Sequence, residues 1–377
     1  MKSVALVTEY NPFHNGHLYH AQQSKSITNS DISIAIMSGN FVMRGQPAIY
    51  NKFTRAKMAL CAVDLAVELP AYASVSAGQY FAKTAVQIAD YLNVSHLSFG
   101  SESGNMDDFL SLAQSIDKIE QSPLFLEKLK EGKSYPRILS ELITDNDLLS
   151  SPNNTLGLSY VRAIQTYAPS IQPWTISRFQ SAHHDNEISH QTFASGTSIR
   201  QSLMNQTDHW KDVVPSEIHK HYERPHISIE DTFNYLKYAI LSQDATSLAQ
   251  IYTMSEGIEN RILQTIERAT SFEHLMTLLK TKRYTYTHIQ RLLMNILLNF
   301  KKYDEPASIN AVRILGMSER GQQYLKQIKK SFPERNFVTQ VNKQNANLFT
   351  NEIHATKIYN LISGQTANDF NTPVIRI

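Results

Sequence analysis

The stretch that decides the fold is Lys2-Ser-Val-Ala-Leu-Val-Thr8, which continues through Glu9-Tyr-Asn-Pro-Phe13 into His14-Asn-Gly-His-Leu-Tyr-His20. A continuous apolar run with β-branched residues is typical of a buried parallel strand. The residue before a proline favours extended backbone, so Asn11-Pro12 predicts an extended segment ahead of a turn. The sequence therefore predicts a strand, a tight loop and a helix that begins near His14 to Gly16.

The start of that helix suits a phosphate group, because a helix N-terminus presents unpaired N–H groups and the positive end of the helix dipole. Gly16 has no side chain that would hinder close approach. His14 and His17 are three residues apart and can face the same ligand. Two capping histidines without a ligand are the plain structural alternative. A zinc site that includes His20 is less favoured, because helical spacing turns His20 away from His14.

Strands and helices alternate beyond this point. Four further apolar runs, at 31–37, 64–69, 94–99 and 172–179, alternate with helical patterns at 16–26, 52–62 and 77–93. Such alternation predicts an α/β fold, here a Rossmann-like domain with a parallel sheet covered by helices. Ligands of such folds bind at the carboxyl ends of the strands, where Gly100 and Arg178 also fall.

The chain of 377 residues is long for one core, so we expect two domains. Residues 1–205 form the expected nucleotide-binding catalytic domain, with a helical insertion at about 103–167. Residues 206–377 read as a mainly helical second domain. Within it, residues 280–303 hold six cations and no carboxylate, and Tyr284, Tyr286 and His288 stand among the cations. This composition suits RNA contact, with Lys282, Arg283 and Arg291 as candidates, although a solvated helix end has the same composition.

The formal net charge of +2 gives no overall signal for nucleic acid, so any such surface must be local. The single cysteine, Cys61, excludes an intrachain disulfide and fits a reducing compartment. No apolar run approaches the length of a membrane span, and no signal-peptide pattern is present. We therefore expect a cytoplasmic protein without membrane contact, and the sequence does not predict an oligomeric state.

His14-Asn-Gly-His17 after a first strand resembles the H-x-G-H motif of the nucleotidylyltransferase superfamily. Three longer segments are similar to the bacterial tRNA(Met) cytidine acetate ligase family within it: residues 9–20, 37–48 and 51–60. Further matches are Phe99-Gly-Ser-Glu102, Ser151-Pro-Asn-Asn154 and Ser195-Gly-Thr-Ser-Ile-Arg200. At Gly196 this chain departs from many superfamily members, which have a serine there.

The resemblance implies that His14 and His17 stabilise the transferring phosphoryl group and that Arg200 holds the outer phosphates. It also implies ATP contact for a larger set of residues: Val7, Thr8, Glu9, Tyr10, Asn11, Pro12, Phe13, His14, Asn15, Gly16, His17, Leu18, Tyr19, His20, Gly100, Asn153, Arg178, Ser195, Thr197 and Ser198. Mg²⁺ is expected to accompany ATP, although the sequence shows no dedicated metal site.

The activity that the resemblance implies has two half-reactions. Acetate is first activated by ATP as acetyl-adenylate, and the acetyl group then passes to the exocyclic amine of the wobble cytidine of elongator tRNA(Met), forming 4-acetylcytidine. Two alternatives stay open at this point. One is a small-molecule nucleotidylyltransferase of the pantetheine-phosphate or nicotinate-mononucleotide type, and the other is a non-catalytic RNA-binding protein. A small-molecule nucleotidylyltransferase would not need a helical second domain. The intact motif histidines argue against a non-catalytic RNA-binding protein.

Overall fold

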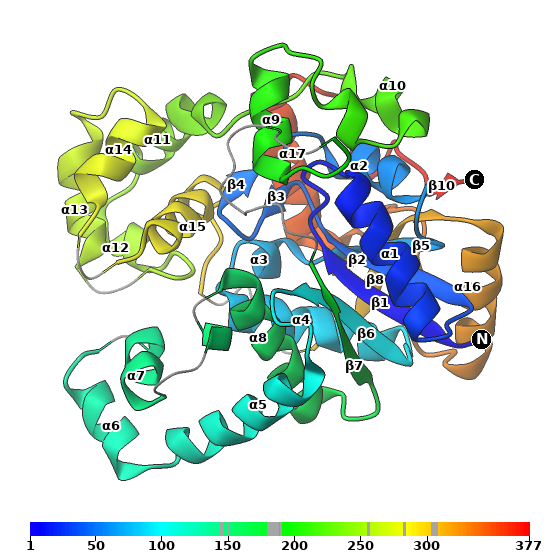
Figure 1. Ribbon diagram of the computed structural model, residues 1–377. Coiled ribbons are helices and arrows are strands. Elements are labelled where there is room, and N and C mark those ends of the chain that lie inside the picture. Colours follow the sequence, from blue (N-terminus) through cyan, green and yellow to red (C-terminus); the bar gives the residue numbers. More distant parts are fainter. Residues whose placement is uncertain are drawn as a thin grey trace.

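The computed structural model describes residues 1–133, 135–143, 147–149, 151–178, 188, 191–254, 257–281, 284–302 and 308–377. Its centre is an eight-stranded sheet in the order β10-β8-β5-β2-β1-β6-β7, with β9 beside β8 (Figure 1). The strands are β1 Ser3–Thr8, β2 Ile32–Ser38, β5 Leu65–Leu69, β6 His96–Ser101, β7 Gln172–Ser177, β8 Ala311–Met317, β9 Asn336–Val338 and β10 Ile375–Arg376. A separate hairpin pairs β3 Phe41–Val42 with β4 Gln46–Pro47.

The five strands expected from the sequence are parallel, which confirms the α/β prediction. From β1 the chain moves through β2 to β5 on one side and later to β6 and β7 on the other. The carboxyl ends of β1 and β6 therefore flank the point where the strand order reverses. In open α/β sheets this point is where a crevice for ligands forms.

Helices cover both faces of the sheet because its central strands are apolar on both sides. Val4 and Leu6 of β1 pack with α1 Asn15–Ile27 and α2 Lys52–Ala59 on one face. Ala5 packs on the opposite face with α4 Gly78–Tyr91 and α8 Pro152–Tyr167. The expected helical insertion consists of α5 Met106–Glu120, α6 Pro123–Lys130, α7 Tyr135–Leu142 and α8. The short α3 Ala71–Ser74 precedes α4.

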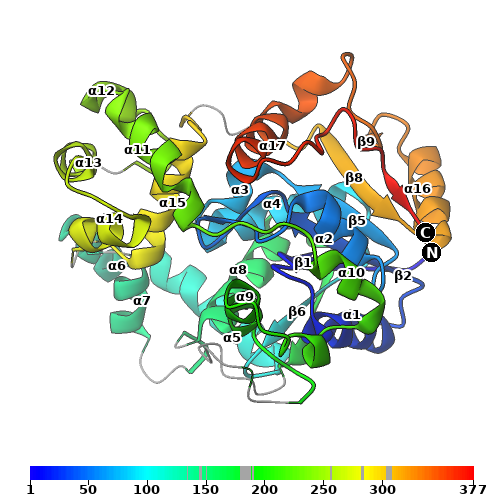
Figure 2. The ribbon, with the colours of Figure 1, turned by 90° about the horizontal axis from the view of Figure 1, so that it is seen from above.

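After β7 the chain forms α9 Gly196–Met204 and α10 His219–Tyr222, which lie above the sheet in Figure 1. It then builds a helical lobe at the side of the molecule, seen also from above in Figure 2. The lobe comprises α11 Phe233–Leu241, α12 Ala245–Ala249, α13 Ile258–Ile266, α14 Phe272–Leu279 and α15 Tyr286–Leu297.

The structure differs from the expectation of a helical unit that continues to residue 377. From Ala311 the chain returns to the sheet, where β8 runs antiparallel to β5 and parallel to β9 and β10. Between these strands lie α16 Glu319–Ser331 and α17 Thr350–Ser363. The run Ala-Val-Arg-Ile-Leu-Gly-Met of β8 is apolar apart from Arg313, whose burial on folding is not evident from the sequence. Residues 311–377 thus complete the sheet.

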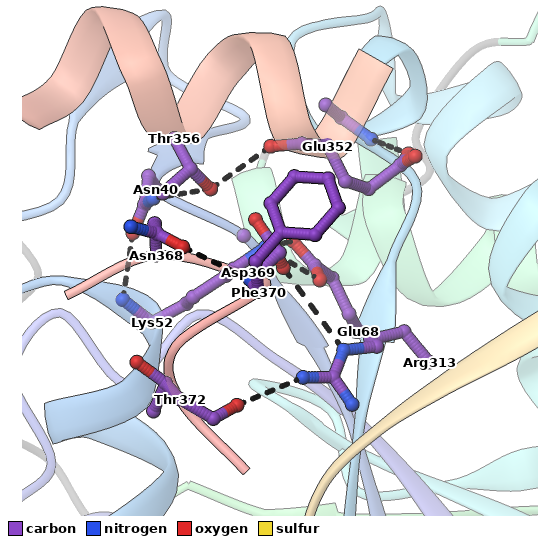
Figure 3. Close-up of polar contacts among 12 residues, drawn as sticks. Asn40, Lys52, Glu68, Arg313, Glu352, Thr356, Asn368, Asp369, Phe370 and Thr372 are labelled. Carbon is purple, nitrogen blue, oxygen red and sulfur yellow. Dashed lines mark hydrogen bonds and ion pairs between the residues drawn. The ribbon is translucent and has the colours of Figure 1, made fainter. Parts of the chain in front are cut away.

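A buried charged cluster fastens the C-terminal tail to the sheet (Figure 3). Lys52 of α2 lies 2.7 Å from Glu68 of β5 and 2.7 Å from Asp369 of the tail, and none of the three is more than 4% exposed. Arg313 lies 4.0 Å from Asp369 and donates to the carbonyl of Thr372. The cluster thus joins three segments that are distant in the sequence.

The charges of this cluster nearly balance. Burial lowers the pKa of Lys52, but the neighbouring Glu68 and Asp369 raise it by more, so the amine stays charged. Burial raises the pKa of the third carboxyl group, Glu352 of α17, which accepts a hydrogen bond from the Ala71 N–H. Two cations, Lys52 and Arg313, therefore face a group of buried carboxyl groups, and burial also raises the pKa of Glu68 to about 7.

Candidate active site

The two motif histidines form the N-terminal cap of α1. His14 Nδ1 accepts a hydrogen bond of 3.1 Å from the Gly16 N–H, and His17 Nδ1 accepts one of 3.3 Å from the His14 N–H. The rings stack with their centroids 3.8 Å apart. Because both Nδ1 atoms accept, each neutral ring carries its hydrogen on Nε2. The two Nε2–H groups therefore remain as donors for a ligand.

Both rings are neutral at pH 7. Burial lowers the pKa of His14 to about 3, and nearby Arg178 and Arg200 lower it further. Burial also lowers the pKa of His17 well below its ordinary value, and that of His20 to about 4. A neutral imidazole donates a hydrogen bond without adding charge, and an arriving phosphate raises these pKa values by supplying the missing negative charge.

Gly16 leaves room for the ring of His14. A Cβ atom at this position would lie 2.9 Å from Cε1 and 3.0 Å from Nδ1 of His14. The sequence analysis assigned Gly16 to the close approach of a phosphate. The structure shows that it also makes room for the capping ring, so a side chain here would displace the cap itself.

A second helix N-terminus meets the first at the β1–α1 loop. Arg200 of α9 donates from Nη1 to the Asn11 carbonyl at 2.6 Å and from Nη2 to Thr197 Oγ1 at 3.1 Å. A Cβ atom on Gly196 would lie 3.2 Å from that same carbonyl oxygen. The glycine that departs from the superfamily pattern thus permits close contact between α9 and the loop.

The serines of this segment cap their own helix. Ser195 Oγ accepts from the Ser198 N–H at 3.0 Å, and the Ser198 hydroxyl lies 2.9 Å from the Ser195 carbonyl. This is the arrangement of an ordinary N-cap. Their predicted contact with ATP stays a prediction, and Arg200 is the side chain of this segment that reaches the β1–α1 loop.

Arg178 follows β7 directly, and its N–H donates to the Ser101 carbonyl of β6 at 2.9 Å. Its charge lowers the pKa of His14, His17 and His20. A Cβ atom on Gly100 would lie 3.2 Å from Cγ of Arg178. Gly100 therefore leaves room for the arginine, and its contact with ATP stays a prediction.

Asn153 lies at the start of α8 and is held by a residue that the sequence analysis did not single out. Its Nδ2 donates to Glu102 Oε1 at 2.5 Å, while Glu102 Oε2 accepts from the Asn154 N–H at 3.1 Å. In return the Glu102 N–H donates to Asn154 Oδ1 at 2.9 Å. The only indication of Glu102 in the sequence was its place in Phe99-Gly-Ser-Glu102, a segment that resembles the family. This link joins the end of β6 to the start of α8.

Several residues of the segment 7–20 have structural tasks in the loop. Tyr10 and Phe13 are buried, and Asn11 Oδ1 accepts from the Ile49 N–H at 2.7 Å. Asn15 donates to the Thr192 carbonyl. Contact with ATP stays a prediction for this part of the set, which comprises Val7, Thr8, Glu9, Tyr10, Asn11, Pro12, Phe13, Asn15, Leu18 and Tyr19.

Arg55 of α2 is a second residue that the sequence analysis missed. It is completely buried, and it donates to the carbonyls of Tyr50, Ser38 and Glu9 and to that of Gly39. Burial lowers its pKa to about 10, which leaves it charged. The only indication of Arg55 in the sequence was its place in the segment 51–60, which resembles the family. Arg55 fixes the ends of β1 and β2 and thereby the floor of the crevice.

Among the candidates for RNA contact, Lys282 and Arg283 lie outside the described residues. Arg291 is half-buried on α15, where its backbone touches the tip of the β3–β4 hairpin at Gly45. In the described ranges no group of three or more His, Cys, Asp or Glu side chains could hold a metal ion. No described helix is long and apolar enough to cross a membrane.

Comparisons with known proteins identify the family of the chain. The model of the family HIGH Nucleotidyl Transferase matches residues 1–372. The chain is 98% identical over 377 residues to a tRNA(Met) cytidine acetate ligase of Staphylococcus saprophyticus, with all of both chains covered. It is 58% identical over 376 residues to the ligase of the same name from Staphylococcus aureus strain JH9, covering 100% of this chain and 99% of that one.

Two solved structures share the fold over their full length. Apo Thermotoga maritima TmcAL matches with a TM-score of 0.90 and 26% identity, with 100% of both chains covered. The same protein bound with alpha-thio ATP matches with a TM-score of 0.86 and 26% identity, again with 100% of both chains covered. By its sequence, fold and site, the chain belongs to the tRNA(Met) cytidine acetate ligases, within the HIGH nucleotidyl transferase family.

Proposed function

We propose that this ligase activates acetate with ATP and transfers the acetyl group to the exocyclic amine of the wobble cytidine of elongator tRNA(Met), forming 4-acetylcytidine. The observation that carries the proposal is the meeting of two helix N-termini at the Asn11 carbonyl. The Arg200 guanidinium is bonded to this carbonyl, the His14 cap of α1 begins three residues later, and the charges of Arg178 and Arg200 both lower the pKa of His14. Such a concentration of donors and positive charge suits a triphosphate.

In the first half-reaction an acetate oxygen attacks the α-phosphorus, while the bond from that phosphorus to the bridging oxygen breaks and pyrophosphate leaves. The Nε2–H groups of His14 and His17 donate to the oxygens that gain negative charge, and Arg200 stabilises the leaving pyrophosphate. Positioning and charge stabilisation suffice for such a transfer, because no protein nucleophile is required.

In the second half-reaction the cytidine amine nitrogen attacks the acetyl carbonyl carbon, and the bond to the AMP oxygen breaks. The ligase therefore has to bring a nucleotide of tRNA to the same crevice. We propose that the helical lobe after residue 205 contributes the tRNA surface, with Lys282, Arg283 and Arg291 as contacts. The supporting observation is that α15, which carries Arg291, touches the hairpin beside the crevice.

Mg²⁺ fits this site as a partner of ATP. Among the described residues, the carboxylates next to the phosphate donors are Glu9, which accepts from the Met43 N–H, and Glu102, which accepts from Asn153 and from the Asn154 N–H. Both are occupied, so phosphate oxygens and water would provide the ion's ligands. When bound, Mg²⁺ neutralises part of the charge of the triphosphate. We also propose a cytoplasmic location, where ATP and tRNA occur together.

The proposal is tested by measuring acetate-dependent ATP–pyrophosphate exchange and, separately, 4-acetylcytidine in tRNA(Met) by mass spectrometry. We expect exchange only when acetate is present and acetylation only when ATP, acetate and tRNA(Met) are all present. A protein that exchanges pyrophosphate without acetate, or binds tRNA without any exchange, would instead be one of the two alternatives named above. The exposed His209 provides a control variant, His209→Ala, for all site variants.

A further inference from the structure

The β3–β4 hairpin follows β2 and leads into α2, so it stands at the edge of the crevice. Its tip is a tight turn in which the Gly45 N–H donates to the Val42 carbonyl at 2.8 Å. Gly45 has a φ of +79°, which favours glycine. The tip therefore has a defined conformation, although each strand of the hairpin is only two residues long.

Contacts on both sides fix this tip. On one side the Met43 N–H donates to Glu9 Oε1 at 2.8 Å, which ties the tip to the β1–α1 loop. On the other side a Cβ atom on Gly45 would lie 2.5 Å from the backbone nitrogen of Arg291 in α15. The tip thus contacts the β1–α1 loop on one side and α15 of the helical lobe on the other.

Arg44 lies between these two fixed residues and is exposed. Among the described residues it has no ion pair, and the nearest carboxylate of the loop, Glu9, is already used by the Met43 N–H. Met43, the neighbour of Arg44, is bonded to Glu9, and Arg200 is bonded to the Asn11 carbonyl, so the hairpin tip and α9 meet the same β1–α1 loop. The charge of Arg44 also lowers the pKa of Arg200. Two arginines without a carboxylate between them repel one another, and the repulsion ends when an anion binds to both.

We propose that Arg44 is a further phosphate-binding residue, which the hairpin places opposite Arg200 to hold the outer phosphates of ATP and the leaving pyrophosphate. The inference rests on the proposed function, because the anion is the triphosphate that this function uses. A phosphate of the tRNA backbone shares the same chemistry, and the test below separates the two sources.

The experiment compares Arg44→Ala and Arg44→Lys with the unchanged protein in acetate-dependent ATP–pyrophosphate exchange. We expect Arg44→Ala to raise the KM for pyrophosphate and for ATP by about 10- to 100-fold, the scale of one charge-assisted contact. Arg44→Lys recovers part of this loss, because lysine keeps the charge but not the planar fork. Binding of AMP stays unchanged, because AMP has no outer phosphates.

Arg268→Ala, a change of an exposed arginine in the helical lobe, is the matched control, and thermal unfolding shows that each variant is folded. Unchanged KM values for ATP and pyrophosphate in Arg44→Ala would overturn the inference. So would normal exchange together with a loss of tRNA acetylation, which would assign Arg44 to tRNA. Failure of the proposed function is a separate result, because the unchanged protein would then show no acetate-dependent exchange.

Discussion

The same sheet carries two groups of ionisable side chains with different surroundings. At the carboxyl ends of β1, β6 and β7, the neutral rings of His14 and His17 gather with Arg178 and Arg200. In the part of the chain that the structure describes, the nearby carboxylates Glu9 and Glu102 accept hydrogen bonds from the Met43 N–H and from Asn153. Beside β5 and β8, Lys52 and Arg313 are matched by buried carboxyl groups (Figure 3). The difference teaches that unmatched positive charge marks the place for an anionic ligand, whereas matched buried charge holds the fold together.

The matched cluster is where substitution is expected to act most strongly on stability. Lys52→Met removes the cation from two buried carboxylates and is expected to lower the free energy of unfolding by about 3–5 kcal/mol. Denaturant unfolding measures this. The control is Lys25→Met, which breaks a partly exposed pair with Asp64 and is expected to cost at most about 1 kcal/mol. Equal losses in both variants would contradict the structural role of the cluster.

The unmatched group is expected to show the reverse pattern. His14→Ala and His17→Ala each remove one phosphate donor, and we expect adenylate formation to fall by about 100- to 1,000-fold. The protein should stay folded, because a lost helix cap costs only about 1 kcal/mol. Acetate-dependent exchange and thermal unfolding are measured on the same samples. Near-normal exchange by both variants would remove the histidines from the mechanism.

The free energy of unfolding should decrease in acid, because the buried ring of His14 is neutral in the folded protein. Its pKa is about 3 in the folded protein and near 6.5 in the unfolded chain, so the unfolded state binds more protons between these values. Stability is therefore complete above pH 6.5 and falls as the pH decreases, by up to about 1.4 kcal/mol per pH unit. His14→Asn keeps a helix cap without a titrating group and should flatten this slope. Denaturant unfolding at pH 7, 6 and 5 measures the slope for the unchanged protein and for His14→Asn, with His209→Asn as the control.

The smallest expected effect concerns the helical lobe. Charge reversal at Lys282, Arg283 and Arg291 should weaken tRNA binding and flatten its dependence on salt, because each lost phosphate contact releases fewer counterions. Adenylate formation should survive, since its residues lie in the crevice. Affinity for tRNA(Met) at several salt concentrations measures the slope. An unchanged slope together with a lower thermal stability would show that these residues only support the lobe.

The parts of the fold that sequence predicts well are those with local patterns. The apolar run of β1 and the glycine between His14 and His17 place the strand, the loop and the helix start correctly. The return of the chain to the sheet at β8 was missed, because Arg313 interrupts the apolar run and its burial depends on Asp369 and on distant carbonyls.

The parts of the site that sequence reasoning missed depend on contacts between distant segments. Arg200 and the Asn11 carbonyl are 189 residues apart, so neither Gly196 nor the joining of two helix N-termini can be read from local spacing. Arg55 and Glu102 each stand in a segment that the family resemblance marked, yet their hydrogen bonds with the backbone become evident only in the structure. The family resemblance indicates the segments that matter, and the structure shows which of their residues hold the site in place through hydrogen bonds.

The most direct test of the central claim, that the unmatched cations await a triphosphate, is a crystal structure of this ligase with a slowly hydrolysed ATP analogue. The account predicts phosphate oxygens within hydrogen-bond distance of Nε2 of His14 and His17 and of the Arg200 guanidinium. It also predicts that the cluster around Lys52 keeps its ion pairs unchanged. A triphosphate bound elsewhere, with no phosphate oxygen near either histidine, would contradict the account.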